Sequence, residues 1–155
     1  MKWNLEELTE DAILAYLEAN LEVDIQIYTA WGFTSNPKYP AAIIHAGQSE
    51  PISEDAAWHD PRSVTVEVAV ITEAAPRTNP GGVVIATARE RNIEARSAIM
   101  DLLAVSDLNA QLIAQEIDDV AFSMAQVTET ERSTEERHLI TTITILVIAE
   151  PVTGS

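Results

Sequence analysis

The alternation of apolar and polar residues predicts two long strands at the centre of the fold. Residues Leu139–Glu150 are almost all β-branched or aliphatic, and such side chains pack well on the pleated surface of a strand. Because successive side chains point to opposite faces, one face carries the odd-numbered residues Thr141, Ile143, Ile145 and Val147. The even-numbered residues are also apolar in the second half, so this strand needs cover on one face and on part of the other. Its predicted neighbour is Ser63–Thr72, which has valine at four alternate positions.

Helical spacing of apolar residues predicts two main helices. Over residues 4–20 apolar side chains recur every three or four positions, which is the pattern of an amphipathic helix. We expect Asn4 and Glu7 to form a variant of the capping box, with Thr9 as a second candidate for the cap. The second main helix is predicted over Thr87–Ala104 by the same spacing.

Shorter elements complete the pattern. A short third helix is predicted over Leu108–Gln115, with Asp107 as its cap. The remaining strands are predicted at Val23–Ile27, Tyr39–Ala46 and Val120–Val127. The charged segment Thr128–Arg137 joins the last two strands, either as a solvated hairpin tip or as a docking arm. Helices and strands in this order indicate an α+β fold.

Two loops carry large aromatic side chains. In Tyr28–Lys38, Trp31 and Phe33 are predicted to form either a satellite of the core or a protein-contact patch. The loop Gly47–Pro61 is longer than most loops in compact domains, and such loops are usually functional or disordered. Trp58 in its middle argues against simple disorder.

Charge narrows the classes of protein. The chain has 25 acidic and 9 basic residues, a formal net charge of −16 and an isoelectric point near 4.3. Affinity for nucleic acids and for anionic membranes depends on basic groups, so this charge opposes both kinds of binding. The acidity serves either solubility alone or a surface that DNA passes without adhering. The length of 155 residues fits one domain, residues 1–155.

Two absences exclude further classes. The sequence has no cysteine, which rules out disulfides, thiolate nucleophiles and cysteine-based zinc sites. No stretch approaches the roughly 20 apolar residues of a membrane span, and the first helix is interrupted by acidic residues, unlike a signal peptide. We therefore expect a soluble protein that is made in the cytoplasm and contacts no membrane.

Residues for catalysis or metal binding are not arranged in a motif. The three histidines lie in three different elements without metal-ligand spacing: His45, His59 and His138. His45 is expected to be partly buried in an apolar strand. The loop Ser49–Asp60 gathers serines, a histidine and carboxylates, so an acidic metal-dependent hydrolase that uses this loop is the alternative from the enzyme class. We expect no enzyme activity, no metal and no cofactor.

The order and texture of the segments resemble one family. An acidic helix is followed by VDIQI, by YPAAIIHA, by a long loop with Glu50-Pro51-Ile52 and by RSVTVEVAVIT. A helix ending in SAIMDLLA, the strand VAFSMAQV, a charged hairpin and LITTITILVIAEP follow. Over about residues 8–151 this chain resembles the tail terminator proteins of long-tailed bacteriophages, also called tail-completion or neck proteins. That family has no invariant catalytic motif, so the resemblance assigns no single functional residue.

The resemblance implies a small α+β domain with two main helices packed on a mainly antiparallel sheet of about five strands. It also implies a homo-oligomeric ring, typically a hexamer, on the finished tail tube in the neck of the virion. Such a ring stops polymerisation of the tail tube protein, offers a surface to the head–tail connector protein and lets DNA pass through its lumen. Another head–tail connector or a tail-tube-like protein is the alternative within the structural class.

The arginines suggest how neighbouring subunits meet. Three of the seven arginines lie on one predicted helix: Arg89, Arg91 and Arg96. Arg89 and Arg96 are seven residues apart and share a face, so we expect both to bridge to acidic residues of the next subunit. Pairing within the chain is the alternative. Together with Trp31, Phe33 and Trp58, they are the candidate subunit or partner interface.

Overall fold

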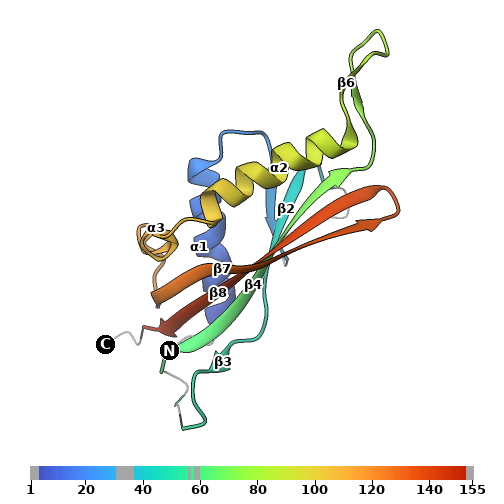
Figure 1. Cartoon of the computed structure of the whole chain (residues 1–155). Helices are drawn as coiled ribbons and strands as arrows, with labels where there is room; N and C mark the ends of the chain where they lie inside the picture. Colours follow the sequence, from blue (N-terminus) through green and yellow to red (C-terminus); the bar gives the residue numbers. More distant parts are fainter. Residues whose placement is uncertain (1–3, 31–36, 56, 58–59, 153–155) are drawn as a thin grey trace.

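The computed structural model describes residues 4–30, 37–55, 57 and 60–152. Over these residues the chain forms three helices and eight strands (Figure 1). Their order is α1 (Leu5–Asn20), β1 (Gln26–Thr29), β2 (Ala41–Ala46), β3 (Glu50–Pro51), β4 (Arg62–Glu73), β5 (Arg77–Thr78), β6 (Val84–Ala86), α2 (Ala88–Leu103), α3 (Leu108–Ile113), β7 (Val120–Glu135) and β8 (His138–Pro151).

The strands build one main sheet and a separate hairpin. The main sheet runs in the order β1-β2-β4-β8-β7, with the short β3 paired to the end of β4, and β5 and β6 pair only with each other. β1 and β2 are parallel, whereas every other pair in the sheet is antiparallel. The predicted α+β fold with a mainly antiparallel sheet is therefore confirmed. The predicted central pair is also confirmed, because β4 and β8 lie side by side with Val66 opposite Ile145.

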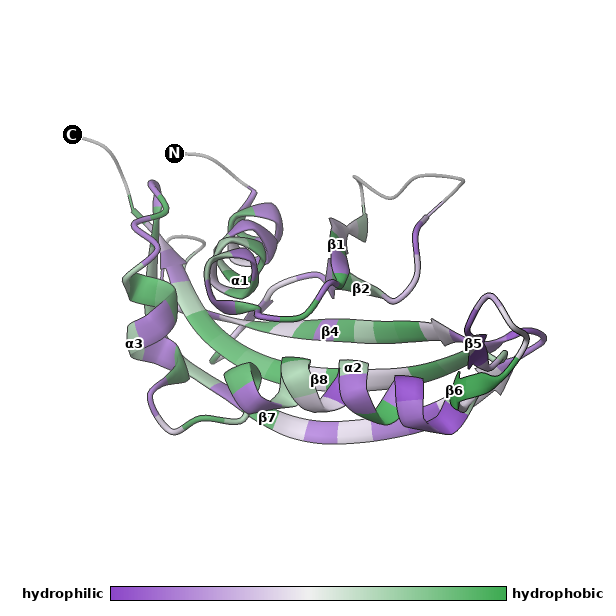
Figure 2. Ribbon diagram, turned by 90° about the horizontal axis from the view of Figure 1, so that it is seen from above, coloured by the Kyte–Doolittle hydropathy of each residue, from purple (hydrophilic) through white to green (hydrophobic). Residues whose placement is uncertain are grey.

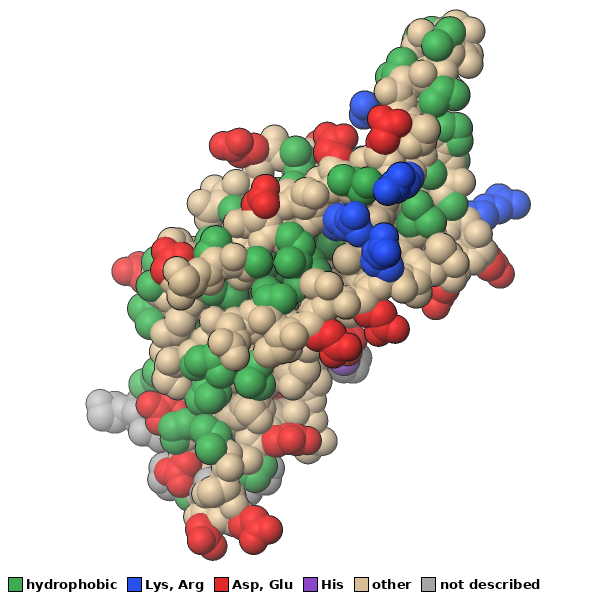
Figure 3. Space-filling view, viewed as in Figure 1, with side chains coloured by type: hydrophobic (Ala, Val, Ile, Leu, Met, Phe, Trp, Pro, Cys, Tyr) green, Lys and Arg blue, Asp and Glu red, His purple; other side chains and the backbone are tan. Residues whose placement is uncertain are grey.

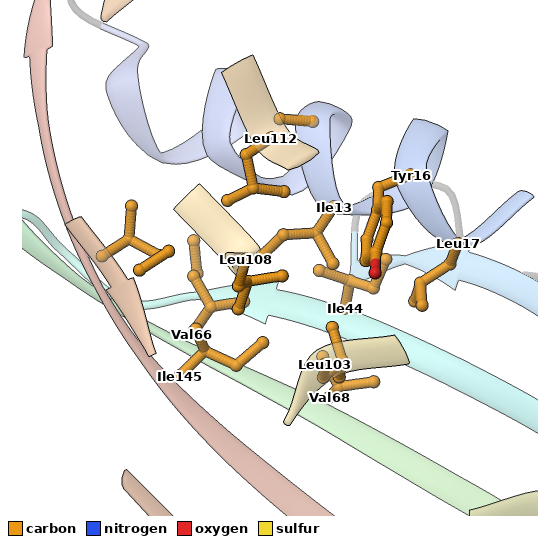
Figure 4. Close-up of a cluster of buried hydrophobic side chains, with 14 of the residues drawn as sticks. Ile13, Tyr16, Leu17, Ile44, Val66, Val68, Leu103, Leu108, Leu112 and Ile145 are labelled. Atoms are coloured by element: carbon orange, nitrogen blue, oxygen red, sulfur yellow. The ribbon is translucent and has the colours of Figure 1, made fainter. Parts of the chain in front are cut away.

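One face of the sheet carries the core. Side chains at alternate positions of the two central strands, from Val64 to Val70 and from Thr141 to Ala149, are buried on this face. All three helices contribute to the same cluster, and Figure 4 shows Ile13 of α1, Leu103 of α2 and Leu108 of α3 among sheet residues. In Figure 2 apolar colour runs along β4 and β8, as expected for strands that are buried on one whole face.

The opposite face of the sheet is open. Thr65 and Glu67 of β4 are exposed there, and Thr144 and Leu146 of β8 are half-buried. No helix of the described part of the chain lies over this face, so the expected second cover of β8 is not supplied by the described residues. The same alternation corrects the expectation for His45, which is exposed because its neighbours in β2, Ile44 and Ala46, occupy the core face.

The predicted helices are present, but their caps differ. Asn4 makes no side-chain capping bond, and Thr9 lies inside α1 with its hydroxyl donating to a carbonyl one turn earlier. Asp107 does not cap α3, because its carboxylate accepts from a glutamine side chain instead. The effective cap is Thr87 of α2, whose Oγ1 accepts from the backbone N–H of Glu90 at 3.1 Å.

The charged segment Thr128–Arg137 is mostly strand. β7 continues to Glu135, and only Glu136 and Arg137 form the turn before β8. The prediction of a strand that ends at Val127 is therefore wrong at its C-terminal end. Threonines alternate with charged residues here, and this pattern suits a solvated strand once a partner is available, which the threonine-rich start of β8 provides.

A buried polar network ties α1 to the sheet and to the long loop. Glu10 is 3% exposed, and its Oε2 accepts from the backbone N–H of Ala46 at 2.9 Å. Glu6 Oε1 accepts from the backbone N–H of Ser49 at 2.7 Å. Arg62 donates to Ser49 twice, from Nε to Oγ and from Nη2 to the carbonyl oxygen, both at 2.9 Å. These bonds hold the start of the loop against α1 and β4.

The two glutamates in this network have opposite pKa shifts. Burial raises the pKa of Glu10, and the bond from the Ala46 N–H offsets only part of this effect. Burial acts in the same direction on Glu6, but hydrogen bonds, chiefly from the Ser49 N–H, and the charge of Arg62 lower its pKa overall. A raised acid pKa means that stability is lost as pH rises above about 4.5, whereas a lowered one means that stability is lost as pH falls below it.

Glutamine substitutions are expected to separate the two effects. The free energy of unfolding of Glu10→Gln, minus that of the wild type, should increase as pH rises above about 4.5, because the variant no longer ionises a buried carboxyl. The same difference for Glu6→Gln should become more negative as pH rises towards about 4.5 from below. Urea unfolding from about pH 3 to about pH 8, a range that includes the titration of carboxyl groups, measures both stability differences as functions of pH. The prediction would be contradicted if the stability differences of Glu10→Gln and Glu6→Gln changed with pH in the same way.

Candidate functional site

A groove runs between α2 and the outer half of the β7–β8 hairpin. It encloses about 780 Å³ and is lined from α2 by Arg89, Asn92, Ile93 and Arg96, and from the hairpin by residues 130–134, Leu139 and Ile140. A second hollow of about 300 Å³ continues it towards the end of α2, since both share Arg96, Thr130 and Arg132. We call the combined feature the α2–β7 groove. Its main part is larger than the hollow beside Leu112, of about 250 Å³, and the hollow beside Leu21, of about 210 Å³.

The groove exists because α2 does not lie over β7. Asn92 of α2 is 7% exposed, and its Nδ2 donates to Thr72 Oγ1 of β4 at 3.0 Å. Ile99 and Leu103 follow on the same side of α2 and are fully buried. These contacts place α2 above the two central strands, so the outer half of β7, the edge strand, extends beyond the helix without cover. The uncovered strip becomes the wall of the groove.

The groove gathers more basic than acidic side chains in an acidic protein, since three arginines line it together with Glu131 and Asp101. Arg89 and Arg96 come from α2 and Arg132 comes from β7, so three of the nine basic residues line one hollow. Figure 3 shows basic side chains gathered over α2 and the hairpin, with acidic side chains distributed around them. Within the described part of the chain these three arginines form no ion pair. Arg91 belongs to another side of α2, where its Nη1 donates to the carbonyl oxygen of Ala75 at 3.3 Å.

This arrangement suits an anionic segment of protein. A guanidinium binds a carboxylate through two parallel hydrogen bonds, and such charge-assisted bonds are about twice as strong as neutral ones. Ile93, Leu139 and Ile140 add apolar surface between the arginines. The combination can hold a segment in which acidic and aliphatic side chains alternate. A small inorganic anion would leave the apolar surface unused.

The structure brings together two of the residues predicted from the sequence and adds a third. Arg89 and Arg96 line the same groove, as expected for two helical residues that are seven positions apart. Their pairing within the chain is not found among the described residues. The sequence pattern does not predict Arg132 as part of this site, because its segment, Thr128–Arg137, is expected to be a charged connection. The alternation around it, with Thr130 and Thr134 two positions away on either side, was the available signal.

The aromatic candidates for the interface cannot be compared with the groove. Trp31, Phe33, Trp58 and also His59 lie outside the described residues, so neither the core interpretation nor the contact interpretation is tested. Among the residues that the structure does describe, no group of three or more histidines and carboxylates is placed to hold a metal ion.

The loop that was the alternative site for hydrolysis has a structural role at its start. Ser49 is 7% exposed and its hydroxyl accepts from Arg62 Nε, so this hydroxyl is held in the network between α1 and β4. The residues that follow, Glu50 to Asp55, are exposed, and Ile52 is 56% exposed among the carboxylates. We call residues 50–55 the acidic loop. In Figure 1 it lies at the lower end of the molecule, next to β3.

A second projecting surface is the hairpin of β5 and β6. Residues 77–86 form an arm that extends beyond the main sheet (Figure 1). Asn79 Oδ1 accepts from the Val83 N–H at 2.9 Å, and Gly82 takes the positive φ of +80° that the turn requires. Three consecutive aliphatic residues are more than half exposed: Val83, Val84 and Ile85. Contiguous apolar surface of this kind is typical of protein contacts.

Comparison with solved structures gives a likeness in fold. No protein-family profile matches the chain, and no curated protein matches it. A chain from the solved structure of the virion of a native gene transfer agent (GTA) particle has a similar fold, with a TM-score of 0.61 and 14% sequence identity. The match covers 96% of this chain and 99% of that chain. Separately, no helix within the described residues is long and apolar enough to cross a membrane.

Proposed function

We propose that this chain is a structural virion protein that forms a ring at the head-proximal end of a long phage tail. The ring ends the growth of the tail tube and joins the tail to the head–tail connector. The observation that carries the proposal is the likeness in fold to a chain of a gene transfer agent virion, which extends over nearly the whole of both chains. The resemblance of the sequence to tail terminator proteins agrees with it.

The surface of the chain supports assembly. The α2–β7 groove presents three arginines without an ion pair among the described residues, and the rest of the chain carries most of its 25 carboxylates. Oppositely charged surfaces on one molecule favour contact between copies. The net charge of −16 also suits a lumen through which DNA passes, since adhesion to phosphates needs basic residues. The proposed work of the protein is therefore assembly and not catalysis.

The proposal predicts a specific assembly state. The purified chain should form a ring, typically of six copies, that is visible by negative-stain microscopy and has the matching mass by light scattering. Added to polymerising tail tube protein, it should bind the tube ends and stop elongation. Open-ended tubes made of this chain alone would indicate the tail-tube-like alternative. A chain that stays monomeric at high concentration and ignores tube ends would overturn the proposal.

Arg89 and Arg96 are the first residues to test. We expect Arg89→Glu with Arg96→Glu to abolish the ring, because each guanidinium that bridges to a carboxylate of the next subunit becomes a repelling carboxylate. Light scattering at equal protein concentration measures the loss, and an unchanged melting temperature shows that the fold is intact. Arg91→Glu with Arg77→Glu is the matched control, since it makes the same charge change outside the groove. An intact ring in the first variant would contradict this role.

A further inference from the structure

We infer that the α2–β7 groove of one copy receives the acidic loop, residues 50–55, of the next copy. This inference rests on the proposed ring and identifies which segment of the neighbour fills the groove. The predicted pairing of Arg89 and Arg96 with acidic residues of the next subunit is thereby extended to Arg132. The acidic residues of that subunit are specified as those of residues 50–55.

The two surfaces match in chemistry. The groove offers three guanidiniums from Arg89, Arg96 and Arg132, against two carboxylates from Glu131 and Asp101 that also line it, so its net charge is positive. The acidic loop offers three exposed carboxylates from Glu50, Glu54 and Asp55. Between its carboxylates the loop exposes Ile52 by 56%, and the groove contains the side chains of Ile93 and Leu139. Of the large apolar side chains that are exposed on the described surface, Ile52 is the one set among carboxylates on both sides of it in the sequence.

The two surfaces also match in length. From Arg89 to Met100, at the far end of the groove, α2 rises about 16 Å, at 1.5 Å per residue. Six residues in an extended form span at most about 20 Å. The acidic loop starts in the strand conformation of β3, which pairs with the beginning of β4. Its first residues are therefore already extended and could lie along the groove.

A single copy cannot fill its own groove. The acidic loop is attached beside Arg62, and the groove lies beside Leu139, which pairs with Thr72 at the other end of β4. The ten-residue separation corresponds to about 33 Å along the strand. The loop is held at its base by the bonds between Ser49, Glu6 and Arg62, so it does not reach that far. The contact must therefore form between copies.

This placement produces a head-to-tail contact. Donor and acceptor are different surfaces at opposite ends of the same two strands, and Figure 1 shows β3 far from the outer end of the β7–β8 hairpin. Repetition of such a contact gives a closed ring when the rotation between copies closes, and a filament when it does not. A two-fold dimer could satisfy both surfaces only by placing each loop in the groove of the other copy, and the mass by light scattering distinguishes such a dimer from a ring.

A charge-swap experiment tests the inference. The groove variant carries Arg89→Glu, Arg96→Glu and Arg132→Glu, and the loop variant carries Glu50→Arg, Glu54→Arg and Asp55→Arg. Each variant alone presents two surfaces of the same sign, so we expect its half-assembly concentration to rise by about 100-fold or more. An equal mixture presents opposite charges at both kinds of contact. It should therefore regain rings in which the variants alternate and the number of copies is even.

The control variant carries Glu18→Arg, Glu22→Arg and Asp24→Arg. These residues are exposed and lie outside both surfaces, and the change in net charge equals that of the loop variant. It should form rings alone, and in a mixture with the groove variant those rings should contain none of the groove variant. Circular dichroism and melting temperature confirm the fold of each variant.

The outcomes separate the two proposals. A wild-type chain that does not form rings overturns the proposed function and this inference with it. If the wild-type chain forms rings and the groove variant or the loop variant still assembles alone, only the inference is overturned. The inference is also overturned when the mixture of groove and loop variants fails to form rings although both are folded. It is overturned as well when rings of the control variant incorporate the groove variant to the same extent as rings of the loop variant do.

Discussion

Replacing Ile145 with alanine is expected to lower the free energy of unfolding by about 2–5 kcal/mol, the usual cost of removing a large aliphatic side chain from a packed core. Ile145 is fully buried at the centre of β8, opposite Val66 of β4. It also belongs to the cluster that collects side chains from all three helices (Figure 4). The cavity left by the substitution is enclosed by sheet and helices, so neighbouring side chains can fill only part of it.

The adjacent residue gives the matched control. Leu146 has nearly the same volume but points to the open face of the sheet, where it is half-buried. Leu146→Ala should cost less than about half as much, because less apolar area is lost from the packed side. Urea unfolding at equal protein concentration measures both, since association between copies also stabilises the folded chain. Equal losses for the two variants would show that the open face is packed as tightly as the core.

Replacing Arg62 with methionine is expected to cost about 2–4 kcal/mol, because removal of one partner leaves buried polar groups unpaired. Arg62 is 6% exposed and donates to both the hydroxyl and the carbonyl oxygen of Ser49. Its charge also lowers the pKa of Glu6, whose carboxylate accepts from the Ser49 N–H. Methionine keeps much of the volume but supplies none of these bonds.

This substitution also has a local consequence. The acidic loop begins at Glu50, directly after the residue that Arg62 holds, so its base should become mobile in the variant. Hydrogen exchange of the Ser49 amide should then be faster than in the wild type by more than the change in global stability explains. Arg77→Met, at an exposed position of β5, is the control and should stay within about 0.5 kcal/mol of the wild type. A loss below about 1 kcal/mol in Arg62→Met would contradict a structural role for the network.

Agreement between sequence and structure is best where local pattern and burial coincide. β4 and β8 were predictable because valine or isoleucine at alternate positions both favours an extended chain and marks the buried face. α1 and α2 were predictable because their apolar stripes are long and regular. The caps were less predictable. Asn4 and Asp107 are good caps by residue type, but a cap forms only when the backbone before the helix has suitable dihedral angles.

The outer hairpin and the arm show where local pattern is insufficient. Residues 128–135 have little apolar content, and their strand form depends on pairing with the start of β8, residues 138–144, and not on a buried face of their own. The arm has strands of only two and three residues, shorter than the runs from which a strand can be recognised. Both elements are exposed, so they lack the alternation of apolar residues from which a strand is predicted.

The α+β class, the two central strands, the main helices and the acidic character of the chain follow from residue spacing and composition, which are local or additive properties. The meeting of Arg132 with Arg89 and Arg96, and the position of the acidic loop at the other end of β4, are evident from the folded chain alone. The groove and the loop are placed by strand register and by the seat of α2 on the sheet. Both arise from packing between segments far apart in the chain, which no local pattern records.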